Sequence, residues 1–149
     1  MKNARAGGGG VSQGWKYVNL PKSKEFPFSD GVLAGETMYL SGRIGLDPKT
    51  KWAAEDVEQE ARLMLEGFRK VLGKAKMTMD DLVYVTVYCT DLSLFSRFNA
   101  IYRTYFRGEF PARAFLGAGS LVLGARFEIQ GIAIRRSTAA KAARTKGTR

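Results

Sequence analysis

The sequence predicts an α+β domain in which two helices cover one face of a mostly antiparallel sheet. Three stretches of the 149-residue chain carry this prediction. Residues 54–75 place apolar side chains at every third or fourth position, which is typical of an amphipathic helix. Residues 82–90 are β-branched and aromatic, as in a central strand. Residues 110–136 have the pattern of two further strands joined by a glycine-rich connection.

The first third of the chain is predicted to form strands, preceded by a disordered leader. Residues 1–14 are rich in glycine, and we expect a disordered leader there, before a domain at 15–136. A short strand is expected near 15–20. Residues 31–34 and 37–42 flank the turn signal Gly35-Glu36, which predicts a β-hairpin.

The predicted helix at 54–75 has one apolar stripe and a matching distribution of charge. Acidic residues stand near its start and lysines at its end, as the helix dipole favours, although neither end shows an ideal capping residue. The stripe consists of Val57, Ala61, Met64, Phe68, Val71 and Ala75.

The second half adds a strand, a helix and the two strands of residues 110–136. In the strand at 82–90, alternation puts Val83, Val85, Val87 and Cys89 on the helix-covered face, and Tyr84, Thr86 and Tyr88 on the other. A second helix is expected at 92–106, and residues 137–149 are expected to form a disordered basic tail. The element order is then β-β-α-β-α-β-β.

That order leaves the second face of the sheet uncovered. The face carries Tyr84, Thr86 and Tyr88, and a chain of this size has no third layer to cover it. The sequence therefore predicts that the protein forms an oligomer through this face.

Composition limits the chemistry. The chain has no histidine, which excludes Ser-His-Asp and Cys-His catalysis and the common zinc sites. The single cysteine, Cys89, excludes an internal disulfide and fits a cytoplasmic protein. No apolar run approaches the roughly 20 residues that a membrane helix needs, and residues 1–14 lack the apolar segment of a secretory signal.

The net charge of +10 is concentrated at the ends of the chain. Six basic residues lie in the segments 1–14 and 137–149, which hold no acidic residue, and the remainder carries +4. We expect the basic tail to bind polyanions weakly and in a salt-dependent way.

Arg113 and Glu128 are the candidate chemical groups. Arg113 stands at the start of the first strand of residues 110–136, and Glu128 stands early in the second strand. Strand interiors are depleted in glutamate, so Glu128 between Phe127 and Ile129 is unusual. Two ordinary explanations stay open: Glu128 lies on a solvated face, or it pairs with Arg113 across adjacent strands.

Three sets of motifs together resemble the Rid family, the reactive intermediate deaminases, also called YjgF or endoribonuclease L-PSP-like proteins. They are FPFSDG with LSGRIGLDP, FNAIYRTYF in the second predicted helix, and FPAR followed fifteen residues after its arginine by the glutamate of FEIQGIAIRR. The resemblance runs from residue 26 to residue 136, and the combination is more specific than any one motif.

The resemblance implies a chorismate-mutase-like fold and a homotrimer in which the sheets pack inside a barrel, with clefts between subunits. By the resemblance, Arg113 binds the substrate carboxylate and Glu128 positions a water molecule, while Ser41 and Asn99 match the family's serine and helix asparagine. Departures occur at Phe28, where tyrosine is usual, at Phe115, where cysteine is usual, and at Asp30, Gly45 and Gln130.

The expected reaction is the hydrolysis of reactive 2-imino acids to 2-keto acids and ammonia, without a metal or an organic cofactor. Arginine binds a carboxylate through two parallel hydrogen bonds, and a glutamate can accept a proton from the attacking water. Phe28 and Phe115, counted with the substrate-binding residues, indicate a larger apolar substrate or a weakened activity. The alternatives are 2-aminomuconate deamination, a trimeric metabolite-binding or chaperone-like module without catalysis, and RNA cleavage, which the absence of histidine disfavours.

Overall fold

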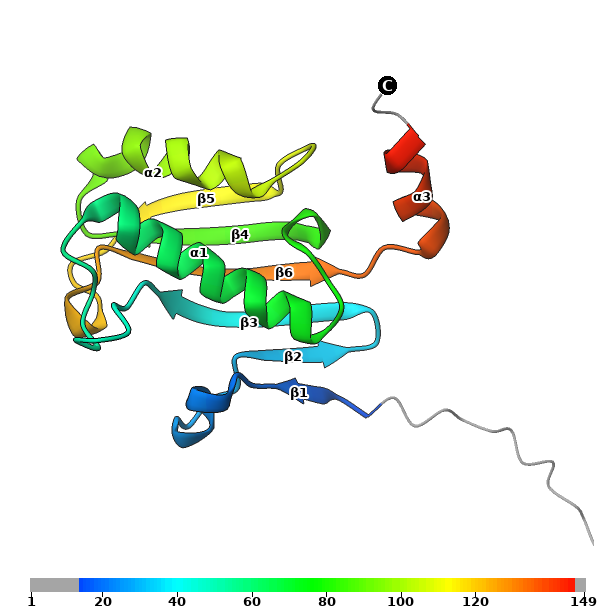
Figure 1. The fold of residues 1–149 in the computed structure, drawn as a ribbon, viewed down its shortest axis with the longest axis horizontal. Coiled ribbons are helices and arrows are strands. Elements are labelled where there is room, and N and C mark those ends of the chain that lie inside the picture. Colours follow the sequence, from blue (N-terminus) through cyan, green and yellow to red (C-terminus); the bar gives the residue numbers. More distant parts are fainter. Residues whose placement is uncertain (1–13, 147–149) are drawn as a thin grey trace, which may run out of the picture.

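The structure is a computed structural model that describes residues 14–146. A six-stranded sheet has the strand order β1-β2-β3-β6-β4-β5, and helices α1 and α2 lie on one face of it (Figure 1). Only the β4–β5 pair is parallel, so the predicted α+β class with a mostly antiparallel sheet is confirmed. The strands are β1 (Lys16–Val18), β2 (Gly31–Ala34), β3 (Thr37–Ile44), β4 (Leu82–Cys89), β5 (Ala112–Gly117) and β6 (Phe127–Ile134).

The predicted hairpin forms as β2 and β3. Gly31 lies opposite Leu40 and Ala34 opposite Thr37, which leaves Gly35 and Glu36 as the connection. Gly35 has a φ of +61°, a left-handed conformation that glycine adopts without steric cost. The turn residue thus fixes the register of the strand that carries Ser41.

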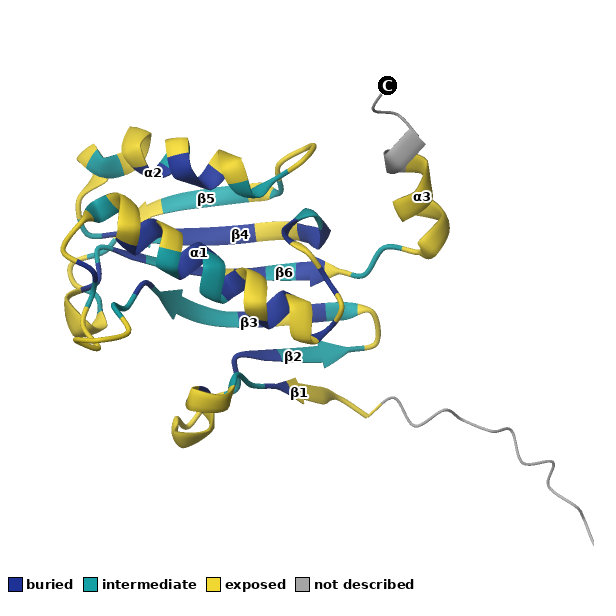
Figure 2. Ribbon diagram, viewed as in Figure 1, coloured by how far each residue is buried: buried dark blue, intermediate teal, exposed yellow. Residues whose placement is uncertain are grey.

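Helix α1 (Val57–Lys74) buries the predicted stripe against the sheet (Figure 2). Ala61, Met64, Phe68, Val71 and Ala75 are all buried, and Val57 is half-buried at the start. The expectation that the helix lacks a good cap is wrong, because the Asp56 side chain accepts a hydrogen bond from the backbone N–H of Gln59 at 2.7 Å.

Glu60 of α1 is a structural residue that the sequence pattern did not single out. Its carboxylate is fully buried and accepts hydrogen bonds from the backbone N–H and the Nε of Arg126, each at 2.6 Å, and from the N–H of Phe127 at 3.1 Å. The Arg126 guanidinium also donates to the backbone carbonyls of Ala54 and Glu55. This network fixes the start of β6, one residue before Glu128, to the first turn of α1.

The alternation predicted for β4 holds only in part. Val85, Val87 and Cys89 are buried on the helix side, as expected, but Val83 is 42% exposed. The register between β4 and β6 shifts between Leu82 and Tyr84, and Leu82 takes the buried place expected of Val83. A β-bulge explains this correction, because an extra residue reverses the alternation beyond it.

The strands of residues 110–136 form but do not pair with each other. β4 lies between β5 and β6, so β5 is an edge strand whose one neighbour is β4. Helix α2 (Phe95–Tyr102), with 3-10 turns at Leu92–Leu94 and Arg103–Tyr105, fills the predicted helical stretch. The ring of Phe98 on α2 lies 5.4 Å from that of Phe115 on β5 and 4.9 Å from that of Phe127 on β6.

The C-terminal segment differs from the prediction of a disordered tail. Helix α3 (Thr138–Lys146) follows β6 and stands away from the sheet (Figure 1). Alanine, lysine and arginine are strong helix formers, and the N–H of Ala140 donates to the Ser137 hydroxyl at 3.3 Å, as in an N-terminal cap. The predicted disordered leader lies outside the described residues except for Gly14.

Candidate active site

Arg113 lies on the helix-covered face of the sheet, at its β5 edge. In the parallel pairing it lies opposite Val85, which is fully buried under the helices. Three aromatic rings surround its guanidinium: the central carbon lies 4.6 Å from the ring centroid of Tyr102, 5.5 Å from that of Phe115 and 5.8 Å from that of Phe95. Cation–π contacts of this kind hold a guanidinium in one orientation.

A hydrogen bond to Asn99 also holds the Arg113 side chain in place. The side-chain oxygen of Asn99 accepts a hydrogen bond from Nη2 of Arg113 at 2.8 Å. Asn99 lies on α2 between Phe95 and Tyr102, one helical turn from each, so one short helix supplies the amide and two of the three rings. The structure thus brings together two of the predicted site residues, Arg113 and Asn99.

Two buried polar atoms near Arg113 have no hydrogen-bond partner. They are Nη1 of Arg113 and the hydroxyl oxygen of Tyr102. Burial lowers the pKa of Arg113, although the nearby Tyr102 partly offsets this, and burial raises the pKa of Tyr102 to about 12. Leaving a buried donor unpaired costs about 1–3 kcal/mol, so the arginine has an unmet capacity to bind an acceptor.

The surface beside Arg113 is suited to an anion. A cleft of about 210 Å³ is lined by Asn99, Tyr102, Arg103, Phe110, Pro111 and Arg113. This lining contains two arginines and no acidic residue. A planar guanidinium pairs with a carboxylate or a phosphate through two parallel hydrogen bonds.

Phe115 packs beside Arg113, between the sheet and helix α2. Its ring makes an edge contact with Phe95 at 5.0 Å, packs against Phe98, and lies beside the guanidinium. It belongs to the lining of neither cleft described in this section. Within one chain Phe115 contacts the arginine, and its expected contact with the substrate stays a prediction.

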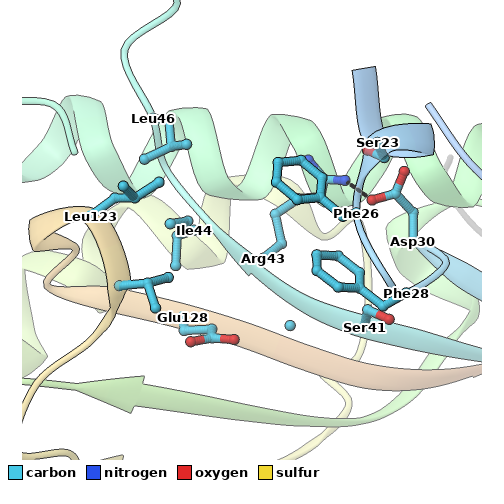
Figure 3. Close-up of a pocket in the computed structure, with 12 residues that line it drawn as sticks. Ser23, Phe26, Phe28, Asp30, Ser41, Arg43, Ile44, Leu46, Leu123 and Glu128 are labelled. Atoms are coloured by element: carbon cyan, nitrogen blue, oxygen red, sulfur yellow. Dashed lines mark hydrogen bonds and ion pairs between the residues drawn. The ribbon is translucent and has the colours of Figure 1, made fainter. Parts of the chain in front are cut away.

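Glu128 lies in a second cleft, of about 590 Å³, on the other side of the sheet (Figure 3). Its neighbours across β6 and β4 show the face it occupies: Glu128 lies opposite Tyr88, on the face without helices. The cleft is lined by Ser23, Phe26, Phe28, Asp30, Ser41, Gly42, Arg43, Ile44, Leu46, Val122, Leu123 and Glu128. Most of this surface is apolar, with Glu128 at one side of its floor.

A bulge in β3 makes room for the Glu128 carboxylate. The pairing of β3 with β6 shifts between Leu40 and Arg43, and this interval contains Ser41 and Gly42. A Cβ atom on Gly42 would overlap Oε1 of Glu128. The glycine therefore lets the carboxylate lie directly against the strand, and bulges commonly have this role beside functional groups.

Ser41 and Asp30 fix the loop that forms one wall of this cleft. The Ser41 hydroxyl donates to the backbone carbonyl of Ser29 at 2.5 Å. Asp30 is buried and accepts hydrogen bonds from Nη2 of Arg43 at 2.6 Å and from the N–H of Leu20 at 2.7 Å. The charge of Arg43 thus explains how a buried aspartate is accommodated at position 30, one of the departures from the family pattern.

Arg113 and Glu128 do not meet within one chain. They lie on opposite faces of the sheet, β4 separates their strands, and the linings of the two clefts share no residue. The alternative of an Arg113–Glu128 salt bridge across adjacent strands is therefore wrong for the single chain. Of the other predicted residues, Ser41 and Phe28 lie with Glu128, and Asn99 lies with Arg113.

Three residues of these surfaces were missed by sequence reasoning. Neither Tyr102, which covers the arginine, nor Arg43 was singled out. Leu123, in the larger cleft, has φ +54° and ψ +31°. The sequence Leu121-Val122-Leu123 gives no signal for this left-handed conformation, which is rare for residues other than glycine, asparagine and aspartate.

Residues 14–146 offer neither a grouping of three His, Cys, Asp or Glu side chains that would hold a metal ion nor a helix that could cross a membrane.

The chain is similar in sequence to known deaminases. The human 2-iminobutanoate/2-iminopropanoate deaminase is 36% identical over 110 residues, which cover 73% of this chain and 80% of the human protein. The deaminase of the same name from Salmonella typhimurium is 37% identical over 113 residues, covering 74% of this chain and 88% of the relative.

The fold is also similar to that of solved structures. The crystal structure of the YjgF gene product from E. coli superposes with a TM-score of 0.75 at 31% identity, covering 81% of this chain and 99% of that protein. E. coli TdcF with bound serine has a TM-score of 0.70 at 31% identity, covering 74% and 90%. A sequence profile of the family Endoribonuclease L-PSP matches residues 21–135. The chain therefore belongs to the endoribonuclease L-PSP family, which is the Rid or YjgF family that its motifs resemble.

Proposed function

We propose that the protein is an imine deaminase that hydrolyses 2-imino acids to 2-keto acids and ammonia. The observation that carries this proposal is the fixed guanidinium of Arg113, which borders a cleft with two arginines and no acidic residue. Such a group fits the carboxylate of a 2-imino acid. Relatives that cover most of the chain are named 2-iminobutanoate/2-iminopropanoate deaminases, which supports the same reaction.

The working enzyme is, in this proposal, a homotrimer with a chorismate-mutase-like barrel, and Glu128 of one copy meets Arg113 of the next. The separation of the two residues on opposite sheet faces supports an assembly of this kind. The open face also carries exposed apolar side chains that an assembly would cover, including Tyr39 at 53%, Tyr84 at 42% and Ile134 at 45% exposure. A closed cyclic assembly places the same pair of half-sites at every interface.

The reaction needs only groups that the two half-sites supply. Arg113 binds the substrate carboxylate and thereby places C2 of the imine near Glu128. The Glu128 carboxylate accepts a proton as the oxygen of a water molecule bonds to C2, and it passes this proton to the imine nitrogen, which gives a carbinolamine. Glu128 then accepts the hydroxyl proton as the C=O bond forms and delivers it to the amine as the C–N bond breaks, so that a 2-keto acid and ammonia leave. These reaction steps require no metal or organic cofactor. The expected location of the protein is the cytoplasm.

The test of this function is the release of ammonia and 2-keto acid from 2-iminobutanoate generated in the assay. An amino-acid oxidase supplies the imine, and semicarbazide competes for it, so a deaminase reduces the amount of semicarbazone formed. The Arg113→Ala and Glu128→Gln variants serve as controls for the two half-sites. An unchanged semicarbazone yield with the wild-type protein would contradict the proposal and would favour a metabolite-binding module that binds carboxylates without turnover.

A further inference from the structure

Within one chain, the cleft that holds Glu128 is much larger than the smallest 2-imino acids require. Its volume is about 590 Å³. At about 30 Å³ for each water-sized group, the roughly seven non-hydrogen atoms of 2-iminobutanoate fill about 200 Å³. The remaining space is bordered by apolar side chains on two opposite walls (Figure 3).

The first wall is an aromatic pair that the loop between β1 and β2 presents to solvent. The rings of Phe26 and Phe28 are stacked, with their centroids 5.5 Å apart and their planes within 12°. Both are about half exposed, at 57% and 52%. Large aromatic residues usually bury most of their surface, so a stacked, exposed pair in a cleft is suited to an apolar ligand group.

The loop that carries this pair is fixed at its C-terminal end. Asp30 binds the Arg43 guanidinium and the N–H of Leu20, and the Ser41 hydroxyl binds the carbonyl of Ser29. These contacts tie the loop to β3, the strand that runs beside Glu128. The rings are therefore held at a set distance from the catalytic carboxylate, because a fixed loop cannot collapse onto the core.

The second wall contains Leu46, Val122 and Leu123. Val122 and Leu123 are 66% and 43% exposed. Leu123 has a left-handed backbone conformation, with φ +54°, which is unfavourable for a leucine. Hydrogen bonds from the N–H of Ala53 to the carbonyl of Leu123 and from the N–H of Ala125 to that of Val122, both at 3.1 Å, hold the turn in this shape. Strain of this kind persists where surrounding contacts fix it, and it is concentrated at ligand sites.

We infer that the cleft selects 2-imino acids with branched or aromatic apolar side chains over those whose side chains have one or two carbons, such as 2-iminopropanoate and 2-iminobutanoate. This inference rests on the proposed function. With C2 of the substrate beside Glu128, the side chain extends between the Phe26–Phe28 pair and Leu123. Each buried methylene contributes about 0.8 kcal/mol, which corresponds to about a fourfold gain in kcat/KM. An imine derived from leucine, with two more carbons than 2-iminobutanoate, is then expected to gain about 15-fold.

The test is a substrate series measured with the full chain. An excess of amino-acid oxidase generates imines from alanine, 2-aminobutyrate, leucine and phenylalanine, and kcat/KM is compared along the series. Affinity for the corresponding 2-keto acids is measured by calorimetry, which needs no turnover. The inference predicts that both quantities rise with the size of the side chain. Equal values along the series, or higher values for the smallest members, would overturn it.

Two variants distinguish an effect of the second wall on substrate preference from an effect on folding. Leu123→Gly removes the apolar side chain and suits the left-handed backbone, so it should reduce the preference for the leucine-derived imine about fivefold without destabilising the turn. Leu92→Ala changes a leucine that is 55% exposed and lies outside the lining of this cleft, and it should leave the preference unchanged.

The affinities for 2-keto acids distinguish a failure of the proposed function from a failure of the inference. If the protein has no turnover but binds larger 2-keto acids more tightly, the deaminase function is contradicted and the selective cleft is retained. If it turns over all the imines without selectivity, the inference alone is contradicted. If Leu123→Gly alters the oligomeric state and not the preference, the wall belongs to a subunit contact and the inference is wrong.

Discussion

Arg113 and Glu128 lie on opposite faces of one sheet, although only strand β4 separates the strands that carry them. Arg113 faces the helices and is enclosed by aromatic rings, whereas Glu128 faces the side that has no helices. One copy of the chain therefore holds each half of the proposed site in a different cleft. This arrangement determines which substitutions are informative.

Arg113→Lys should impair the protein nearly as much as Arg113→Ala. A lysine has no planar fork for a carboxylate and cannot replace the bond from the guanidinium to Asn99 or its contact with the Tyr102 ring. We expect kcat/KM and 2-keto acid affinity to fall by the equivalent of about 2–4 kcal/mol. Arg97→Lys, in an exposed pair with Glu58 at 3.8 Å, is the matched control and should have little effect. Wild-type kinetics for Arg113→Lys would contradict a carboxylate-binding role.

Gly42→Ala should slow turnover and leave the fold stable. The new methyl group overlaps Oε1 of Glu128, and a flexible side chain moves away more easily than backbone. The carboxylate is then displaced, so we expect kcat to fall at least tenfold with little change in 2-keto acid affinity. Gly73→Ala in α1 is the control, since its added methyl meets no atom within 4 Å. Equal activity of the Gly42→Ala and wild-type proteins would argue against a catalytic role for Glu128 in this position.

Glu60→Ala should destabilise the protein strongly. The substitution leaves the Arg126 guanidinium and two backbone N–H groups without their buried acceptor. Removing one partner of a buried pair costs about 3–5 kcal/mol. Urea unfolding at a fixed protein concentration measures this, with Glu66→Ala as a control, because the exposed Glu66–Arg69 pair should contribute no more than about 1 kcal/mol. Similar losses for the two variants would show that the Glu60 network does not anchor β6.

Tyr102 should make stability fall in alkaline solution. Burial raises its pKa from 10.0 to about 12, so above pH 10 the unfolded chain releases this proton while the folded chain retains it. The stability that depends on the neutral phenol is complete below pH 10 and is lost as the pH rises to 12, by at most about 3 kcal/mol at about 1.4 kcal/mol per pH unit. Thermal unfolding of wild type and Tyr102→Phe between pH 9 and 11 measures the difference. An equal decline in both proteins would contradict this assignment.

Local patterns predicted the elements well because each element depends on nearby residues. The apolar stripe defined α1, and Gly35-Glu36 defined the hairpin. Strand pairing depends on contacts distant in sequence, so the position of β4 between β5 and β6 could not be predicted from residues 110–136. The bulge beside Val83 was missed for the same reason. For α3, the apolar stripe that marked α1 was absent, although its composition favours a helix.

The sequence indicated which residues to consider for the site, but not that they are divided between two clefts. The family resemblance selected Arg113, Glu128, Ser41, Asn99 and Phe28, and the structure places all of them at clefts. Which cleft receives each residue depends on sheet pairing. The role of Phe115 also depends on packing, because the sequence does not reveal that α2 brings Phe95 and Tyr102 to the other sides of the same guanidinium.

The most direct test of the account is a mixing experiment with two inactive variants. Arg113→Ala and Glu128→Gln are co-expressed in equal amounts with different affinity tags. Tandem purification of a sample shows that mixed oligomers form, and both these and the unfractionated mixture are assayed with 2-iminobutanoate. If each site takes Arg113 from one copy and Glu128 from the next, random assembly of a cyclic trimer from equal amounts restores about a quarter of the sites. The account therefore predicts that the unfractionated mixture has about a quarter of wild-type activity, while each variant alone is inactive. Mixed oligomers as inactive as the separate variants would contradict a site shared between copies.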